Sequence, residues 1–144
     1  MRDSLGSTEG TGTMTGEVST LRLYVLRGMY LLNVLLVGSG FVTEFVHRQA
    51  PWDQLTGVAF SFWAALATLS AIGLRYPLAM LPLLFIQLLY KTFWLVVVYL
   101  PLRAAGRPSD LAGGFALAIV LDLLVIPWPY AYSQYLRKPA DRWR

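Results

Sequence analysis

The chain has 144 residues, of which 56% are hydrophobic and 14% are charged, and its formal net charge is +4. Soluble domains carry about 25% charged residues and lack apolar runs of about 20 residues, so the composition excludes an ordinary soluble protein. Cysteine is absent, which excludes a disulfide framework, a thiol nucleophile and a cysteine-bound metal. The composition therefore indicates an integral membrane protein.

The N-terminal segment, residues 1–18, is rich in Gly, Ser and Thr and has no apolar period. This composition predicts a disordered polar tail. The segment lacks the continuous apolar region of a cleavable signal peptide, so we expect the first span to be an uncleaved anchor. Because nothing before Met14 resembles a structural element, that residue is an alternative start of the chain.

Four apolar runs follow, each close to the roughly 20 residues that cross a hydrocarbon core of about 30 Å. We place the spans at about residues 23–46, 55–74, 78–100 and 111–132, inside one transmembrane domain at 19–135. Short connections make successive helices antiparallel neighbours. The sequence predicts an all-α integral membrane four-helix bundle with up-down-up-down topology, followed by a basic C-terminal tail at 136–144.

Two of these spans carry a face of small or polar residues. Helical spacing places Asn33, Val37, Gly40 and Glu44 on one face of the first span. We expect this face to point into the bundle, where Asn33 can form an interhelical hydrogen bond. A comparable inward face is predicted for the second span, formed by Gly57, Ser61, Ala64, Thr68 and Ala71.

Prolines and aromatic residues mark the predicted membrane surfaces. Pro82 falls in the first turns of the third span and predicts a kink there. Pro127 and Pro129 are expected to break the fourth helix at the interface, within a belt of aromatic residues. The predicted interface anchors are Arg75, Tyr76, Trp128 and Tyr130.

Lysine and arginine are unevenly distributed between the two sides of the predicted spans. With a cytoplasmic N-terminus, the inner side holds Arg2, Arg22, Arg27, Arg75, Arg137, Lys138, Arg142 and Arg144. The outer side holds only Arg48, Arg103 and Arg107. The positive-inside rule therefore predicts that the N-terminus and the C-terminus are both cytoplasmic. Lipid phosphate explains basic residues at helix ends, so nucleic acid is not an expected partner.

Lys91 is the only formal charge in the third span, and Gln87 precedes it by one helical turn. A lysine at the centre of a span costs at least ~2.5 kcal/mol, so it needs a partner. Asp122 lies on the inward face of the fourth span, at the helical spacing of Gly114 and Ala118. Lys91 and Asp122 lie about 13 and 16 Å from the same surface, which predicts a buried ion pair assisted by Gln87.

The predicted Lys91–Asp122 pair has alternative interpretations. It can fix helix register in a small structural or accessory protein. It can also be the centre of a carrier or channel for protons, ions or a small solute. A water-lined cavity that reaches Asp122 would favour transport, and a dry, tightly packed pair would favour structure. A quinone-linked redox accessory is a third alternative with less support, and Glu44 is a secondary candidate for the partner of Lys91.

No catalytic residue, cofactor or metal site is predicted. His47 is the only histidine, which excludes haem ligation by paired histidines within the chain, and we expect it in an outer loop. Catalytic triads, phosphate-binding loops and metal clusters are absent from the sequence at usable spacing. The expected partner is the lipid bilayer, with a second copy of the chain or another membrane protein as candidates.

Four segments carry a resemblance to known proteins. They are RYPLAMLPLLFIQLLYKTFW at 75–94, VAFSFWAAL at 58–66, VIPWPY at 125–130 and DRWR at 141–144. Through them, residues 20–144 resemble a group of small, uncharacterised four-helix membrane proteins of bacteria and, more distantly, the DoxX-like proteins. The resemblance implies a multi-pass protein of the bacterial inner (cytoplasmic) membrane and transfers no catalytic residue.

Overall fold

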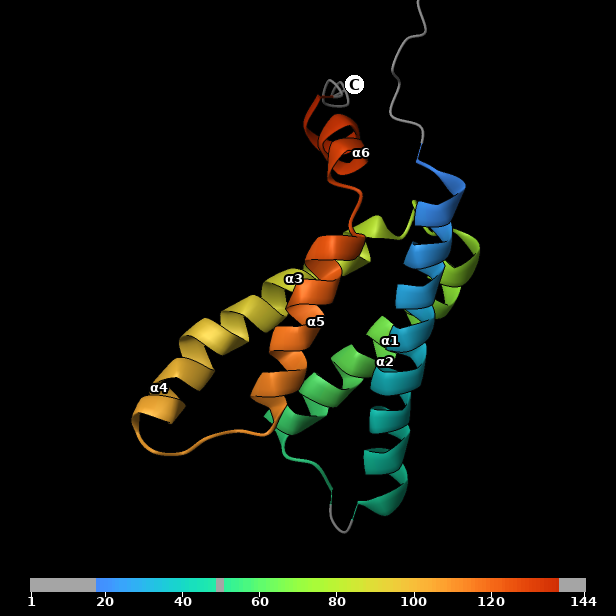
Figure 1. Cartoon of the computed structure of the whole chain (residues 1–144). Coiled ribbons are helices and arrows are strands. Elements are labelled where there is room, and N and C mark those ends of the chain that lie inside the picture. The colour runs from blue at the N-terminus through green and yellow to red at the C-terminus, as the bar shows by residue number, and fades with distance from the viewer. Residues whose placement is uncertain (1–17, 49–50, 138–144) are drawn as a thin grey trace, which may run out of the picture.

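The computed structural model describes residues 18–48 and 51–137, and every regular element in these two ranges is helical (Figure 1). The prediction of an all-α protein is therefore confirmed. The predictions for Met14 and the DRWR segment lie outside the described residues, as do those for nearly all of the two tails.

Three helical stretches are long and apolar enough to cross a membrane. They are α1 (Thr20–His47), α2 (Gln54–Arg75) and the continuous run Leu81–Ala104. This run consists of α3 (Leu81–Phe93), the π-helix η1 (Trp94–Tyr99) and α4 (Leu100–Ala104). The structure thus supports a multi-span membrane protein with at least three candidate spans.

The predicted fourth span is not one straight helix. α5 (Leu111–Val125) ends before Pro127, and the chain turns by 74° into α6 (Trp128–Tyr132) and the π-helix η2 (Ser133–Arg137). With 15 residues, α5 is only about 22 Å long and is shorter than a bilayer core. The predicted break at the prolines is present. A fourth span is possible only if α5 crosses the membrane together with the bent segment of α6 and η2.

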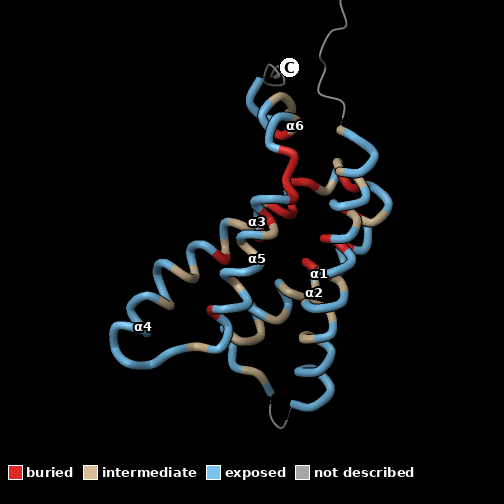
Figure 2. Tube along the Cα trace, in the orientation of Figure 1, coloured by how far each residue is buried: buried red, intermediate tan, exposed pale blue. Residues whose placement is uncertain are grey.

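The start of α1, the end of α2, the start of α3 and the end of α5 lie close together at one end of the molecule, the converging end (Figure 1). Toward the opposite, diverging end, α4 leans away from α5. α1 packs against α2, and α3 packs against α5. The loop after α1 and the loop after α4 both lie at the diverging end, whereas α6 lies beyond the converging end. The buried residues gather near the converging end (Figure 2). They include Leu26, Met29, Tyr30, Leu66, Leu81, Leu84 and Ile126.

Tyr30 is the central side chain of this core. Its ring is fully buried, and its hydroxyl donates a 2.9 Å hydrogen bond to the carbonyl oxygen of Pro77 in the α2–α3 connection. A Cβ atom added at Gly73 would lie 2.8 Å from the Tyr30 ring. Gly73 therefore allows α1 and α2 to approach, since any side chain at that position would meet the ring.

Side-chain caps fix the starts of the first two helices. Ser19 Oγ accepts a 3.3 Å hydrogen bond from the Arg22 amide at the start of α1, as expected for a capping serine. Asp53 accepts from the amides of Leu55 and Thr56 at the start of α2. The Thr56 hydroxyl also donates to Asp53, and together these hydrogen bonds hold the pKa of this carboxyl below its ordinary value.

The third helical run departs from the prediction at Pro82 and contains an unpredicted element before Pro101. Because α3 begins at Leu81, Pro82 lies in the first turn, where it starts the helix without kinking it. The predicted kink is therefore wrong. η1 was not predicted from the sequence, and this widened segment ends two residues before Pro101. Pro101 has no N–H and its ring crowds the preceding turn, which makes this a favourable place for a wider turn.

The predicted inward face of the second span is also wrong. Ser61, Thr68 and Ala71 are exposed. The buried residues of α2 are Leu66, Ser70 and Gly73. The reason is the Tyr30 ring, which selects the side of α2 that carries Gly73.

Candidate functional site

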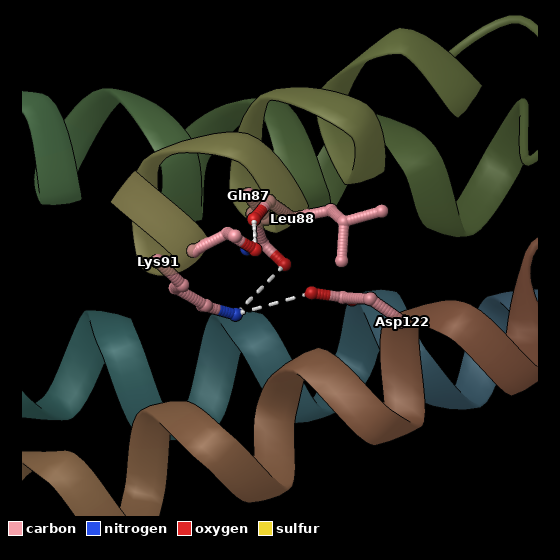
Figure 3. A network of polar contacts seen from close by, with 5 residues as sticks. Gln87, Leu88, Lys91 and Asp122 are labelled. Atoms are coloured by element: carbon pink, nitrogen blue, oxygen red, sulfur yellow. Dashed lines mark hydrogen bonds and ion pairs between the residues drawn. The ribbon is translucent and has the colours of Figure 1, made fainter. Parts of the chain in front are cut away.

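The predicted ion pair is present in the structure. Lys91 Nζ on α3 lies 3.4 Å from Asp122 Oδ2 on α5 (Figure 3). Lys91 is 4% exposed and Asp122 is 0% exposed. The two charges are buried in the interface between two neighbouring helices, so the pair joins α3 to α5.

Gln87 belongs to the same group of contacts. Lys91 Nζ also donates a 3.4 Å hydrogen bond to Gln87 Oε1, one turn earlier on α3 (Figure 3). Both contacts exceed the 2.7–3.2 Å usual for N–H···O hydrogen bonds. Among the described residues, Gln87 Nε2 and Asp122 Oδ1 have no hydrogen-bond partner. The network is therefore loose and only partly satisfied.

A cavity of about 590 Å³ lies beside the pair, with walls from α1, α2, α3 and α5. Lys91 and Asn33 are polar residues of a lining that is otherwise mainly apolar or aromatic, including Met29, Trp63 and Phe115. Asp122 is not a lining residue. Lys91 therefore borders the cavity, whereas Asp122 is enclosed by protein.

The predicted polar face of α1 is only partly inward. Asn33 is 4% exposed and lines the cavity, and Val37 is a further lining residue. Asn33 Nδ2 has no hydrogen-bond partner within the described ranges, so the predicted interhelical hydrogen bond is not formed there. Glu44 is exposed near the end of α1, while the salt bridge of Lys91 is made with Asp122.

α6, which carries the predicted anchors Trp128 and Tyr130, lies beyond the converging end of the helices (Figure 1). Arg75 and Tyr76 are exposed at the end of α2, and the Arg75 guanidinium lies 5.6 Å from the Tyr76 ring centroid. Trp128 Nε1 donates a 2.8 Å hydrogen bond to the Leu123 carbonyl across the bend between α5 and α6. Tyr130 is half-buried.

His47 is exposed at the end of α1, where Nδ1 lies 3.0 Å from the Thr43 carbonyl oxygen. In the described part of the chain, no group of three or more His, Cys, Asp or Glu residues could hold a metal. Asn33 and Lys91 are each predicted from the sequence to lie inside the bundle, but no shared site is predicted for them. Their shared mid-span depth was the only signal in the sequence that could have indicated one.

Comparison with known proteins gives no relative on which to base a function. No protein-family model, curated protein or solved structure matches the chain. The function must therefore be inferred from the site itself. The structure supports a multi-span membrane protein, and this protein has a buried salt bridge between Lys91 and Asp122.

Proposed function

We propose that the chain is a small structural or accessory protein of a bacterial inner membrane, in which the Lys91–Asp122 pair fixes α3 against α5. The observation that carries this proposal is the complete burial of Asp122, outside the lining of the cavity. A carboxylate enclosed in this way has one described cationic partner, 3.4 Å away. Buried pairs of this kind serve best to define a single helix register.

The proposed topology has four spans, with the bent unit of α5, α6 and η2 as the fourth and both termini in the cytoplasm. It is supported by the excess of basic residues on the N-terminal side of the membrane. It is also supported by the arrangement in Figure 1, where the two loops assigned to the outer side lie at the same end.

Reporter fusions test this topology. A reporter fused after Tyr135 is expected to be active in the cytoplasm, and reporters fused at Pro51 or Arg107 are expected to be active on the outer side. The physical reason is the difficulty of moving Lys-rich and Arg-rich segments across the inner membrane. A cytoplasmic signal at Arg107 would contradict the topology.

One observation favours a second candidate function, a carrier for protons, ions or a small solute. Lys91 is a lining residue of the cavity, so the ion pair borders space that a solute could occupy. Intramembrane charges next to a cavity often mark a transport route. The described residues offer no comparable contact that favours the quinone-linked alternative.

The double variant Lys91→Met/Asp122→Leu separates the two candidates. If the pair only fixes helix register, this variant should fold, complement a strain that lacks the chain, and co-purify with the same membrane proteins as the wild type. If the pair transports protons or ions, the variant should fold but lose activity, because it has no charge or exchangeable proton at this site.

The measurements are complementation, mass spectrometry after purification in mild detergent, and proton flux into vesicles loaded with a pH-sensitive dye. We expect the double variant to complement and the wild type to add no proton flux over empty vesicles. A folded double variant that fails to complement, together with wild-type flux that this variant lacks, would overturn the structural proposal.

A further inference from the structure

The cavity between the two helix pairs has the size and position of a ligand site. Its volume of about 590 Å³ lies within the roughly 300–1,000 Å³ that small-molecule pockets occupy. Lining residues Leu36 on α1 and Leu117 on α5 are 63% and 62% exposed. The cavity is therefore open between α1 and α5, on a side where the surroundings of a membrane protein are lipid.

Two buried residues that carry hydrogen-bond donors, Asn33 and Lys91, are lining residues of this largely apolar space. Asn33 is 4% exposed, and its Nδ2 has no acceptor among the described residues. Lys91 Nζ has three protons and two contacts, both at 3.4 Å. A buried donor without an acceptor is unfavourable, so a ligand that supplies an acceptor oxygen here would be favoured.

The charge around the cavity limits the ligand to an uncharged one. Lys91 is already balanced by Asp122, so an added anion would enter an apolar region without a counter-charge of its own. Depth gives the same result. Asn33 is 13 residues from the start of α1 and 14 from its end, about 20 Å from each surface. The ionised headgroup of a lipid would have to leave the membrane–water interface to reach Asn33.

We propose that this cavity binds an uncharged amphiphile with a carbonyl head and a long apolar body, which enters from the bilayer between α1 and α5. The carbonyl oxygen accepts hydrogen bonds from Asn33 and Lys91. The apolar body fills the remaining space along α1 and α5. The site shares Lys91 with the ion pair and adds Asn33 on α1, so ligand binding here goes beyond the proposed role of the pair in fixing α3 against α5.

Three photoreactive probes test the head group in nanodiscs that contain the full chain. All carry the same C16 chain with a diazirine, and they end as a methyl ester, as an ionised acid or as a hydrocarbon without oxygen. The methyl ester should label peptides of α1 and α5 saturably, and excess unlabelled ester should compete. The hydrocarbon and the acid should need at least about tenfold higher concentrations.

Two pairs of variants locate the site. Asn33→Leu should weaken saturable labelling by the ester about three- to tenfold, the effect of losing one hydrogen bond. Ser39→Leu, a polar-to-apolar change at an exposed position of the same helix, should leave it unchanged. Gly114→Leu places a side chain where no atom lies within 4 Å of the glycine, in the cavity lining, and should abolish saturable labelling.

Gly113→Leu is the matched control for Gly114→Leu. Gly113 also has open space around it, but it lines a different cavity that faces α4 and η1. This variant should label as the wild type does. If the hydrocarbon probe labels as well as the methyl ester, the ligand does not need a carbonyl group. If the acid labels more strongly than the methyl ester, the head group is not required to be uncharged. Unchanged labelling of Gly114→Leu would overturn the location.

Discussion

Replacing Lys91 by Met alone, or Asp122 by Leu alone, is expected to lower the free energy of unfolding by about 3–5 kcal/mol. Each single change leaves one buried charge without its partner, since Lys91 is 4% exposed and Asp122 is fully buried. The measurement is unfolding by denaturant in mild detergent, followed by circular dichroism. This is one of the two largest effects that the structure predicts.

The double variant Lys91→Met/Asp122→Leu should recover much of that loss. Neither charge remains to be stranded, and two apolar side chains of similar size can occupy the interface between α3 and α5. The coupling between the two positions is obtained from the four proteins of a double-mutant cycle. Additive losses would show that the side chains do not meet in the membrane.

Arg103→Met provides the control for the loss of a cation. Arg103 is an exposed residue of α4, in the same helical run as Lys91. Its replacement should change the free energy of unfolding by less than about 0.5 kcal/mol, as for most exposed positions. A loss as large as that of Lys91→Met would point to a general effect of charge on the detergent-solubilised protein.

Gly73→Ala is expected to lower the free energy of unfolding by about 1–3 kcal/mol, the usual cost of overpacking a core. The new Cβ would lie 2.8 Å from the ring of Tyr30, which is fully buried and held by its hydrogen bond to the Pro77 carbonyl. A planar ring fixed at both ends cannot move aside as the tip of a flexible side chain can. Either α1 and α2 separate or the ring leaves its position.

Gly57→Ala is the matched control on the same helix. A Cβ at Gly57 would meet no atom within 4 Å, so the change should stabilise α2 by about 0.5–1 kcal/mol through helix propensity alone. Both variants are compared with the wild type in the same unfolding experiment. Equal stability of Gly73→Ala and Gly57→Ala would contradict the close packing of α1 against α2.

The sequence by itself determined the class of the protein and its central polar contact. Long apolar runs require helices in a bilayer, because only helices satisfy every backbone hydrogen bond within one segment. The contact between Lys91 and Asp122 followed from two facts that are local in the sequence. Their helices are neighbours joined by a short loop, and counting residues from that loop places the two charges at one depth.

The orientation of α2 about its axis was decided only by the tertiary structure. In lipid, apolar residues cover both the packed and the lipid-facing sides, so hydrophobic periodicity does not identify the inward face. Small residues on α2 suggested the side with Ser61 and Thr68. The bulk of Tyr30 and the space at Gly73 selected another side, through a contact between residues 43 positions apart.

The cavity, and the absence of a described hydrogen-bond partner for Asn33 Nδ2, likewise depend on the arrangement of whole helices. The sequence placed Asn33 inside the bundle, but whether it finds an acceptor depends on how far α1 lies from α3 and α5. Away from the core, α4 leans away from α5 (Figure 1), and Asn33 and Lys91 both line the cavity that α1, α2, α3 and α5 form. Such divergence comes from packing between distant segments, which no local pattern in the sequence encodes.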